Sequence, residues 1–181
     1  MLIGGIILGL LAGLVLGGKM GNLADIRLRL LPLLFLAVVV RFGTELGLSA
    51  GIELFDLLRL PAFTLAYGLL LYGLWANRAY PGLSLAFVGI GMNAIAIVVN
   101  GGWMPVWAPS LTAAGFDPAT IAGNSVFHRV LGPDLDIRFL LSAGPIGDII
   151  PIPGLIDAVR NVASIGDLFL TAGLGFFLFA T

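Results

Sequence analysis

The chain has 181 residues, of which 59% are hydrophobic and 10% are charged, whereas soluble domains average roughly 45–50% and 25%. The formal net charge of -1 supplies no basic field, so no nucleic-acid partner is expected. With no cysteine and one histidine, disulfides, cysteine nucleophiles and poly-histidine metal sites are excluded, and no metal centre is expected. This composition predicts an integral membrane protein whose main partner is the lipid bilayer.

Long apolar runs predict five membrane spans, because crossing the hydrocarbon takes about 20 residues of helix. The predicted spans are residues 2–18, 30–48, 61–77, 83–99 and 163–181. The first run lacks a basic segment before it and a small-residue cleavage site after it, so it is expected to remain as a span. The predicted fold class is therefore all-α: a polytopic transmembrane helix bundle of one domain, with an outer cap at 101–162.

Basic residues in the short loops predict the orientation, because cytoplasmic loops are enriched in lysine and arginine. Lys19, Arg27 and Arg29 follow the first span, and Arg78 stands between the third and the fourth. These positions predict an N-terminus outside and a C-terminus in the cytoplasm.

Two further segments are predicted to lie at the membrane surface. Residues 52–60 place charged side chains on one helical face and apolar ones elsewhere, which is typical of an interfacial helix. Residues 137–156 are apolar but interrupted by proline and glycine, which favours a re-entrant or interfacial hairpin over a straight helix in lipid. A sixth, broken span is the alternative, and it would place the C-terminus outside. Trp103 and Trp107 fit an interfacial aromatic belt.

The first apolar run carries a regular glycine pattern. Gly5, Gly9, Gly13 and Gly17 recur every fourth residue, so they form a smooth face that lets another helix approach closely. We interpret this face as a packing surface within the chain or toward a partner membrane protein. A ligand groove is the alternative.

Four polar residues inside the predicted spans are candidates for a ligand site or a polar network. Arg41 and Glu45 stand four apart on one helical face, where they would neutralise each other. Asn93 and Asn100 share a face of a later span, where amides usually hydrogen-bond between helices. Substrate contact is the functional alternative for the two asparagines. Arg41 and Glu45 could instead snorkel to the outer surface or serve an unspecified function.

The candidate catalytic residues are Asp148 and Asp167, each of which follows a glycine near the predicted outer boundary. Two carboxylates that meet there would share a proton and act as acid and base. The structural alternative for Asp167 is a helix cap, because Ser164 precedes it by three residues at the start of the last span. His128 lies in a predicted short helix at 125–131. Its alternative roles are a proton carrier, an axial cofactor ligand or a structural group. The cofactor is unknown.

These motifs resemble a family of small bacterial membrane proteins that is labelled only as a domain of unknown function. The resembling stretches are residues 100–105 (NGGWMP), 128–133 (HRVLGP), 147–151 (GDIIP) and 164–167 (SIGD). The resemblance implies a bacterial cytoplasmic membrane and no particular activity. Asp148 and the segment 162–167 also show a weaker likeness to the lipoprotein signal peptidase, a membrane aspartic protease.

Two functions follow from these observations. The first is a small non-enzymatic accessory or structural subunit that packs with a larger membrane complex or binds lipid or a cofactor. The alternative is a membrane-embedded aspartyl hydrolase or peptidase that uses Asp148 and Asp167.

Overall fold

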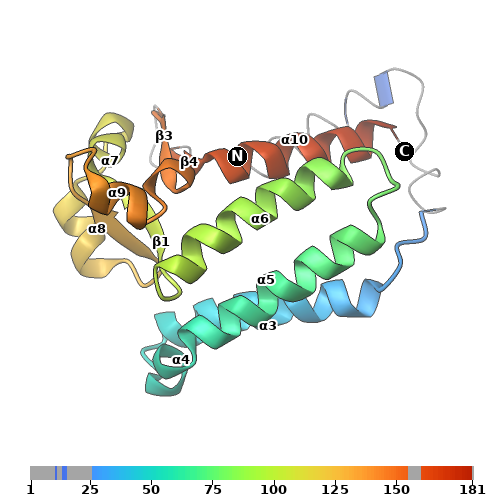
Figure 1. Ribbon diagram of the computed structural model, residues 1–181, viewed down its shortest axis with the longest axis horizontal. Coiled ribbons are helices and arrows are strands. Elements are labelled where there is room, and N and C mark those ends of the chain that lie inside the picture. The colour runs from blue at the N-terminus through green and yellow to red at the C-terminus, as the bar shows by residue number, and fades with distance from the viewer. Residues whose placement is uncertain (1–10, 12–13, 16–25, 155–159, 181) are drawn as a thin grey trace.

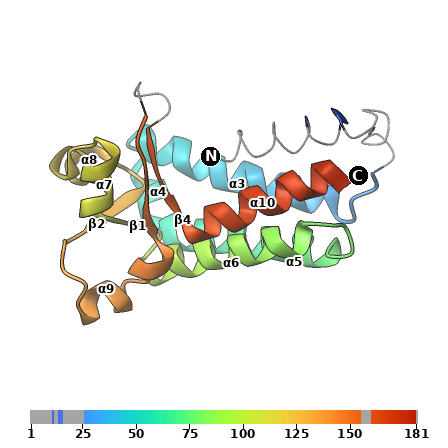
Figure 2. The same cartoon turned by 90° about the horizontal axis from the view of Figure 1, so that it is seen from above.

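The computed structural model describes residue 11 and residues 14–15, 26–154 and 160–180. Four long helices run side by side and form a helical layer, and a smaller part, the cap, lies at one end of that layer (Figures 1 and 2). The four helices of the layer are α3 (Leu31–Ser49), α5 (Arg59–Ala76), α6 (Leu83–Val99) and α10 (Ile165–Ala180). The short helix α4 (Glu53–Leu57) connects α3 to α5 at the cap end.

Small residues let α6 and α10 pack with their backbones close together. A Cβ atom built on Gly89 would overlap the backbone of Gly166, and one built on Gly173 would overlap the backbone of Ala86. Around this contact the layer buries a core that includes Phe63, Leu83, Ile90, Ile97 and Phe177. The packing of α6 against α10 therefore depends on glycine, as expected where helix backbones approach closely.

A buried asparagine closes the opposite end of the layer. Asn77 follows α5, and its side-chain NH₂ donates to the carbonyl oxygens of Gly73 and Arg29. Its side-chain oxygen accepts from the Arg29 N–H. The backbone that leads into α3 is thereby tied to the end of α5, and the buried amide has its hydrogen bonds.

The cap is built on a four-stranded mixed sheet with strand order β2-β1-β3-β4. The strands are β1 (Met104–Trp107), β2 (His128–Leu131), β3 (Asp148–Ile152) and β4 (Asn161–Ser164). β1 is parallel to both β2 and β3, and β3 is antiparallel to β4. The cap also contains the short helices α7 (Ala108–Ala114), α8 (Pro118–Asn124), α9 (Ile137–Leu141) and the 3-10 turn η1 (Gly144–Ile146).

The prediction of an all-α fold is wrong, because the segment predicted to form the outer cap, residues 101–162, contains most of this sheet. The predicted helix at 125–131 is the strand β2 from His128, and the predicted hairpin at 137–156 contains α9, η1 and β3. In β3, Ile149, Ile150 and Ile152 favour a strand, whereas β1, β2 and β4 each contain one valine and carry little strand signal of their own. Their parallel partners are far away in the sequence, so no local hairpin pattern marks them.

The prediction of five membrane spans is also wrong. Within the described residues, only α3 is both long enough and apolar enough to cross a membrane by length and composition. The apolar helices α6 and α10 have 17 and 16 residues, and α5 begins with a buried arginine. The helices cover the ranges predicted as the second to fifth spans, but most of them fall short of the spanning criterion. The predicted span at 2–18 and its glycine face (Gly5, Gly9, Gly13 and Gly17) lie outside the described residues.

Candidate functional site

A histidine from β2 and an aspartate from β3 meet across the intervening strand β1. Asp148 is the first residue of β3 and is only 5% exposed, while His128 begins β2 and is partly exposed. His128 Nε2 lies 3.4 Å from Asp148 Oδ2. On the other side of the ring, His128 Nδ1 lies 2.9 Å from the hydroxyl of Ser125. The result is a polar chain from Ser125 through His128 to a buried carboxylate.

The environment of Asp148 favours its protonated form. Burial raises the pKa of the Asp148 carboxyl above its ordinary value, while the hydrogen bond and charge of His128 act to lower it. The nearby Asp167 adds a further, smaller push upward on the pKa. Desolvation is the largest of these effects. Asp148 is therefore a buried acid whose protonation depends on its pairing with His128.

Asp167 forms a reciprocal capping box with Ser164 at the start of α10. The Asp167 N–H donates to the Ser164 hydroxyl at 2.9 Å, and the Ser164 N–H donates to Asp167 Oδ2 at 3.1 Å. This arrangement satisfies two free N–H groups of the helix start. The other carboxylate oxygen accepts from the Asn93 side chain at 2.8 Å, and the Ser164 hydroxyl donates to the Asn93 side-chain oxygen. Asn93 therefore ties the beginning of α10 to α6.

The two candidate catalytic aspartates lie near each other without a shared hydrogen bond among those observed. Asp148 is paired in register with Ser164, the first residue of the capping box. Each carboxylate nevertheless has its own partners: His128 for Asp148, and Asn93 with Ser164 for Asp167. The structure thus brings both residues to one end of the sheet, where Asp167 acts as a cap. A catalytic role for the pair stays a prediction.

The other polar residues singled out in the sequence have partners inside the layer or at its end. Arg41 and Glu45 form an ion pair at 3.2 Å on α3. The Arg41 guanidinium also interacts with the Tyr67 side chain and lies 5.6 Å from the ring of Phe127. Asn100 closes α6 by donating to the carbonyl of Ala96 and reaches the cap through the carbonyl of Ser142. These are helix-to-helix and helix-to-cap contacts.

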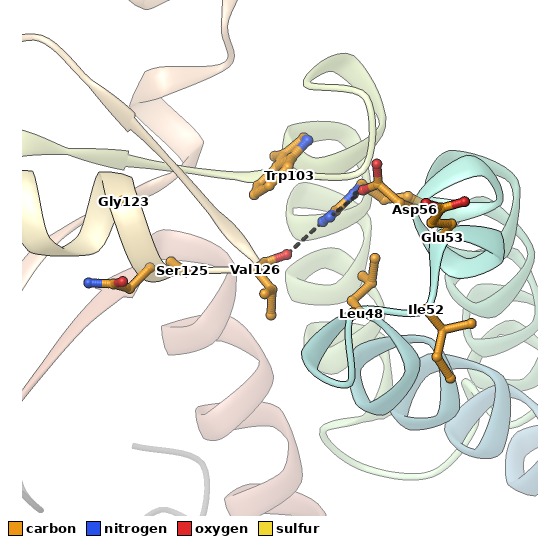
Figure 3. Close-up of a pocket in the computed structure, with 11 residues that line it drawn as sticks. Leu48, Ile52, Glu53, Asp56, Trp103, Gly123, Ser125 and Val126 are labelled. Carbon is orange, nitrogen blue, oxygen red and sulfur yellow. Dashed lines mark hydrogen bonds and ion pairs between the residues drawn. The ribbon is translucent and has the colours of Figure 1, made fainter.

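A pocket of about 390 Å³ opens where α4 faces the connection between α8 and β2. Figure 3 shows Trp103 on one side of it, Leu48 and Ile52 on another, and Val126 between them. Ser125, which holds the His128 ring, lines the same pocket. The pocket and the buried Asp148 are therefore joined by the polar chain described above.

Arg59 is the central charged group of the pocket and is only 6% exposed. Its guanidinium donates to the Val126 carbonyl at 2.6 Å and to Asp56 Oδ1 at 2.9 Å, the interactions drawn as dashed lines in Figure 3. It also lies 3.8 Å from the centre of the Trp103 ring, a cation–π contact. In the described part of the chain, no hydrogen bond or ion pair engages Glu53 at the rim.

This pocket was not predicted from the sequence. Glu53, Asp56 and Arg59 were predicted to share one interfacial helix, whereas in the structure α4 ends at Leu57 and Arg59 is the buried first residue of α5. A signal was present, because an arginine that opens an apolar helix needs an acidic or aromatic partner. The contribution of Ser125 and Val126 had no sequence signal, since they are 66 and 67 residues away from Arg59.

The site combines a pocket that has polar and apolar walls with the neighbouring His128–Asp148 pair. The pocket combines apolar walls with a shielded guanidinium and a free carboxylate, which suits a small ligand with polar and apolar parts. Within the described residues, no three His, Cys, Asp or Glu side chains are grouped to hold a metal ion.

The fold and the site define a mixed helical and sheet protein, with a layer of apolar helices and a polar junction to a small cap. The chain belongs to the family described as "Family of unknown function (DUF5317)", whose model matches residues 25–179. That range includes the helical layer from α3 onward, the cap and both aspartates.

One curated relative is an "Uncharacterized protein" of Thermotoga maritima, which is 43% identical over 49 residues. The match covers 27% of this chain and 29% of that relative. The chain therefore aligns with less than a third of the length of the relative. No solved structure matches the chain.

Proposed function

We propose that this is an integral membrane protein of the bacterial cytoplasmic membrane, in which lipid covers the outer faces of the helical layer. The observation that carries the proposal is the apolar outer surface of those helices. On α3, Phe35 is 68% exposed and Leu46 is 73% exposed. Large apolar side chains also point outward from the other three helices, among them Leu65, Ile95 and Phe176.

Such a surface is unusual for a protein surrounded by water. Single exposed apolar residues are normal, but contiguous apolar surface on a soluble monomer rarely exceeds a few hundred square ångströms. Here the apolar residues follow the helices along their length, and the charged groups of α3 are paired with each other. Lipid can cover this apolar surface even where a single helix is too short to cross the bilayer.

The polar groups of the layer support the same proposal. Thr44 donates to the carbonyl of Val40, Asn77 makes three hydrogen bonds, and Asn93 bonds across to α10. Among the described residues, the hydroxyl of Thr171 is the one buried side-chain polar atom without a partner. Internal satisfaction of polar groups is what a hydrocarbon environment demands, because lipid offers no hydrogen bonds.

Within the membrane, we propose that the protein acts as a non-enzymatic subunit that binds a small ligand or lipid at its cap and packs with larger complexes. Asp167 is engaged as a helix cap, and Arg59 is held by Asp56, Val126 and Trp103. These contacts support a binding and packing role for the polar junction. The glycine face of residues 5–17 is proposed as a partner surface, and it lies outside the described residues.

The test begins with membrane extraction of the full chain. After alkaline carbonate and high-salt washing, the protein is expected to stay in the membrane pellet and to need detergent for release. Replacing Phe35 and Phe42, both exposed on α3, with lysine is expected to reduce membrane retention, because a charge in hydrocarbon costs several kcal/mol. Thr112→Lys, on an exposed position of α7, is the matched control and is expected to change nothing. A wild-type chain that washes off without detergent refutes the proposal.

A second candidate function, a membrane hydrolase using Asp148 and Asp167, has one observation in its favour. Asp148 is buried beside His128 with a raised pKa, and the charge of Asp167 contributes to that rise. Perturbed acids near a pocket mark functional sites more often than chance. The test is hydrolysis of membrane-anchored peptides and lipids by wild type and by Asp148→Asn. Turnover that is lost in a variant of unchanged stability favours the enzyme, and absence of turnover in both favours the subunit.

A further inference from the structure

The short helix α9 differs from the other helices of the cap in what it exposes. Its outer face presents Ile137, Leu140 and Leu141, and the preceding Leu135 is exposed as well, each by more than half of its surface. On a helix, positions 137, 140 and 141 fall on one side. The opposite side is anchored by the buried Phe139, which contacts the Trp107 ring.

The neighbouring cap helices provide an internal comparison. The outward positions of α7 and α8 are small or polar, namely Thr112, Ala113, Ala119, Thr120 and Ala122. Among the described residues of the cap, the exposed large apolar side chains are therefore those of Leu135 and of Ile137, Leu140 and Leu141 on α9. Contact with water accounts for the small and polar outward residues of α7 and α8, but not for the large apolar ones of α9.

The position of α9 relates this face to the helical layer. Asn100, at the end of α6, donates to the carbonyl of Ser142 at the end of α9 at a distance of 2.8 Å. The last turn of α6 also exposes the apolar side chains Val98 and Val99. Figures 1 and 2 place α9 at the cap end of the layer and off to one side of it.

The connecting helix α4 lies at the cap end of the other half of the layer (Figures 1 and 2). It joins α3 to α5 at the cap end (Figure 1), and it exposes Leu54 and Leu57. Two short helices with apolar outer faces thus lie at one end of the layer, on different sides of the cap. That is the arrangement expected where a membrane protein meets the headgroup region.

We propose that the apolar face of α9 lies in the headgroup region of the bilayer, so that the cap rests on the membrane surface through α9 and α4. This inference rests on the proposed placement of the helical layer in lipid. The occupant is a zwitterionic lipid surface, because the charged residues adjacent to this face in the sequence are Asp134, Asp136 and Arg138. Two acids against one base offer no attraction for anionic lipid, and binding depends on apolar contact.

The absence of cysteine in the chain allows a direct test with single nitroxide labels. Full-length protein is labelled at Leu141→Cys or Leu135→Cys for α9, at Ala122→Cys for α8 and at Val39→Cys on the exposed face of α3. Each variant is placed in phosphatidylcholine nanodiscs. Spin relaxation then compares collisions with oxygen, which concentrates in lipid, and with a nickel chelate, which stays in water.

The labels on α9 are expected to show an oxygen-to-nickel ratio several-fold above that of Ala122 and below that of Val39. The ratio is expected to be the same when phosphatidylglycerol is included. If the α9 labels match Ala122 while Val39 reports lipid, the inference on α9 is overturned and the proposed function stands. If Val39 also reports water, the membrane placement itself fails. A ratio on α9 that rises only with anionic lipid refutes the apolar mechanism.

Discussion

Substituting Gly89 tests the close packing of α6 against α10. An added Cβ would overlap the carbonyl oxygen of Gly166 and lie 2.5 Å from the backbone nitrogen of Leu170. Ordinary carbon contacts are about 3.5 Å or more, and backbone atoms cannot rotate away as a side-chain end can. The helices must therefore separate by roughly 1 Å along this contact.

The magnitude follows from two opposing effects of Gly89→Ala. Overpacking typically costs about 1–3 kcal/mol, while alanine gains up to about 1 kcal/mol of helix propensity over glycine. The expected net loss is about 1–2 kcal/mol of unfolding free energy. Gly68→Ala on α5 is the matched control, because nothing lies within 4 Å of its added Cβ. Only the propensity gain applies there, so that variant is expected to be as stable as wild type or more stable.

Thermal unfolding of the detergent-solubilised protein, followed by circular dichroism, compares the two variants. The expected difference between the two variants, about 1–3 kcal/mol, corresponds to roughly 2–12 °C in Tm for a chain of this size. Gly89→Leu is expected to be worse than Gly89→Ala, since the larger side chain needs a wider gap. Equal Tm values for Gly89→Ala and Gly68→Ala would refute the close-packing argument.

Other substitutions test the polar junction and the orientation. Burial raises the pKa of the Asp148 carboxyl in the folded state, so the folded protein holds the carboxyl proton more tightly than the unfolded chain does. The free energy of unfolding is therefore expected to fall as the pH rises from the ordinary pKa of 3.8 through the folded value. Asp148→Asn is expected to flatten this decline, measured by denaturant unfolding from acidic to neutral pH. Asp167→Ala is expected to cost about 1 kcal/mol in unfolding free energy, and Asp167→Asn much less, because asparagine also caps helices; equal losses would contradict the capping role. Arg59→Ala leaves the Val126 carbonyl without its donor and is expected to cost about 1–3 kcal/mol, measured by the same unfolding, whereas no loss would show that the buried contact contributes nothing. A reporter fused after Thr181 is expected to be active in the cytoplasm, as the basic residues Arg27, Arg29 and Arg78 predict, and activity only outside would contradict that orientation.

The long helices were predictable from the sequence because their signal is local. Runs of Leu, Ala, Val and Ile placed α3, α6 and α10 within one or two residues of residues 30–48, 83–99 and 163–181. Whether such a helix crosses a membrane depends on its length and surroundings, which an apolar run alone does not specify. The span count failed for that reason.

The sheet and the pocket were not predictable, because they depend on contacts between distant residues. Strand β1 pairs with β2 and β3 in parallel, so the intervening segments carry no hairpin turn to announce the pairing. The capping box of Ser164 and Asp167 was visible as a local motif. The pairing of Asp148 with His128 was not, because it needs the sheet to bring β2 and β3 to the same region.

The direct passage from β4 into α10 has a mechanical consequence. Strand β4 ends at Ser164 and α10 begins at Ile165, so no flexible residue separates the sheet from the helix. The capping box and the bond from Ser164 to Asn93 stiffen this junction further. A displacement of the sheet would therefore move the start of α10 with it and tilt or slide α10 against α6. In this way, ligand binding at the cap would displace the helical layer as well.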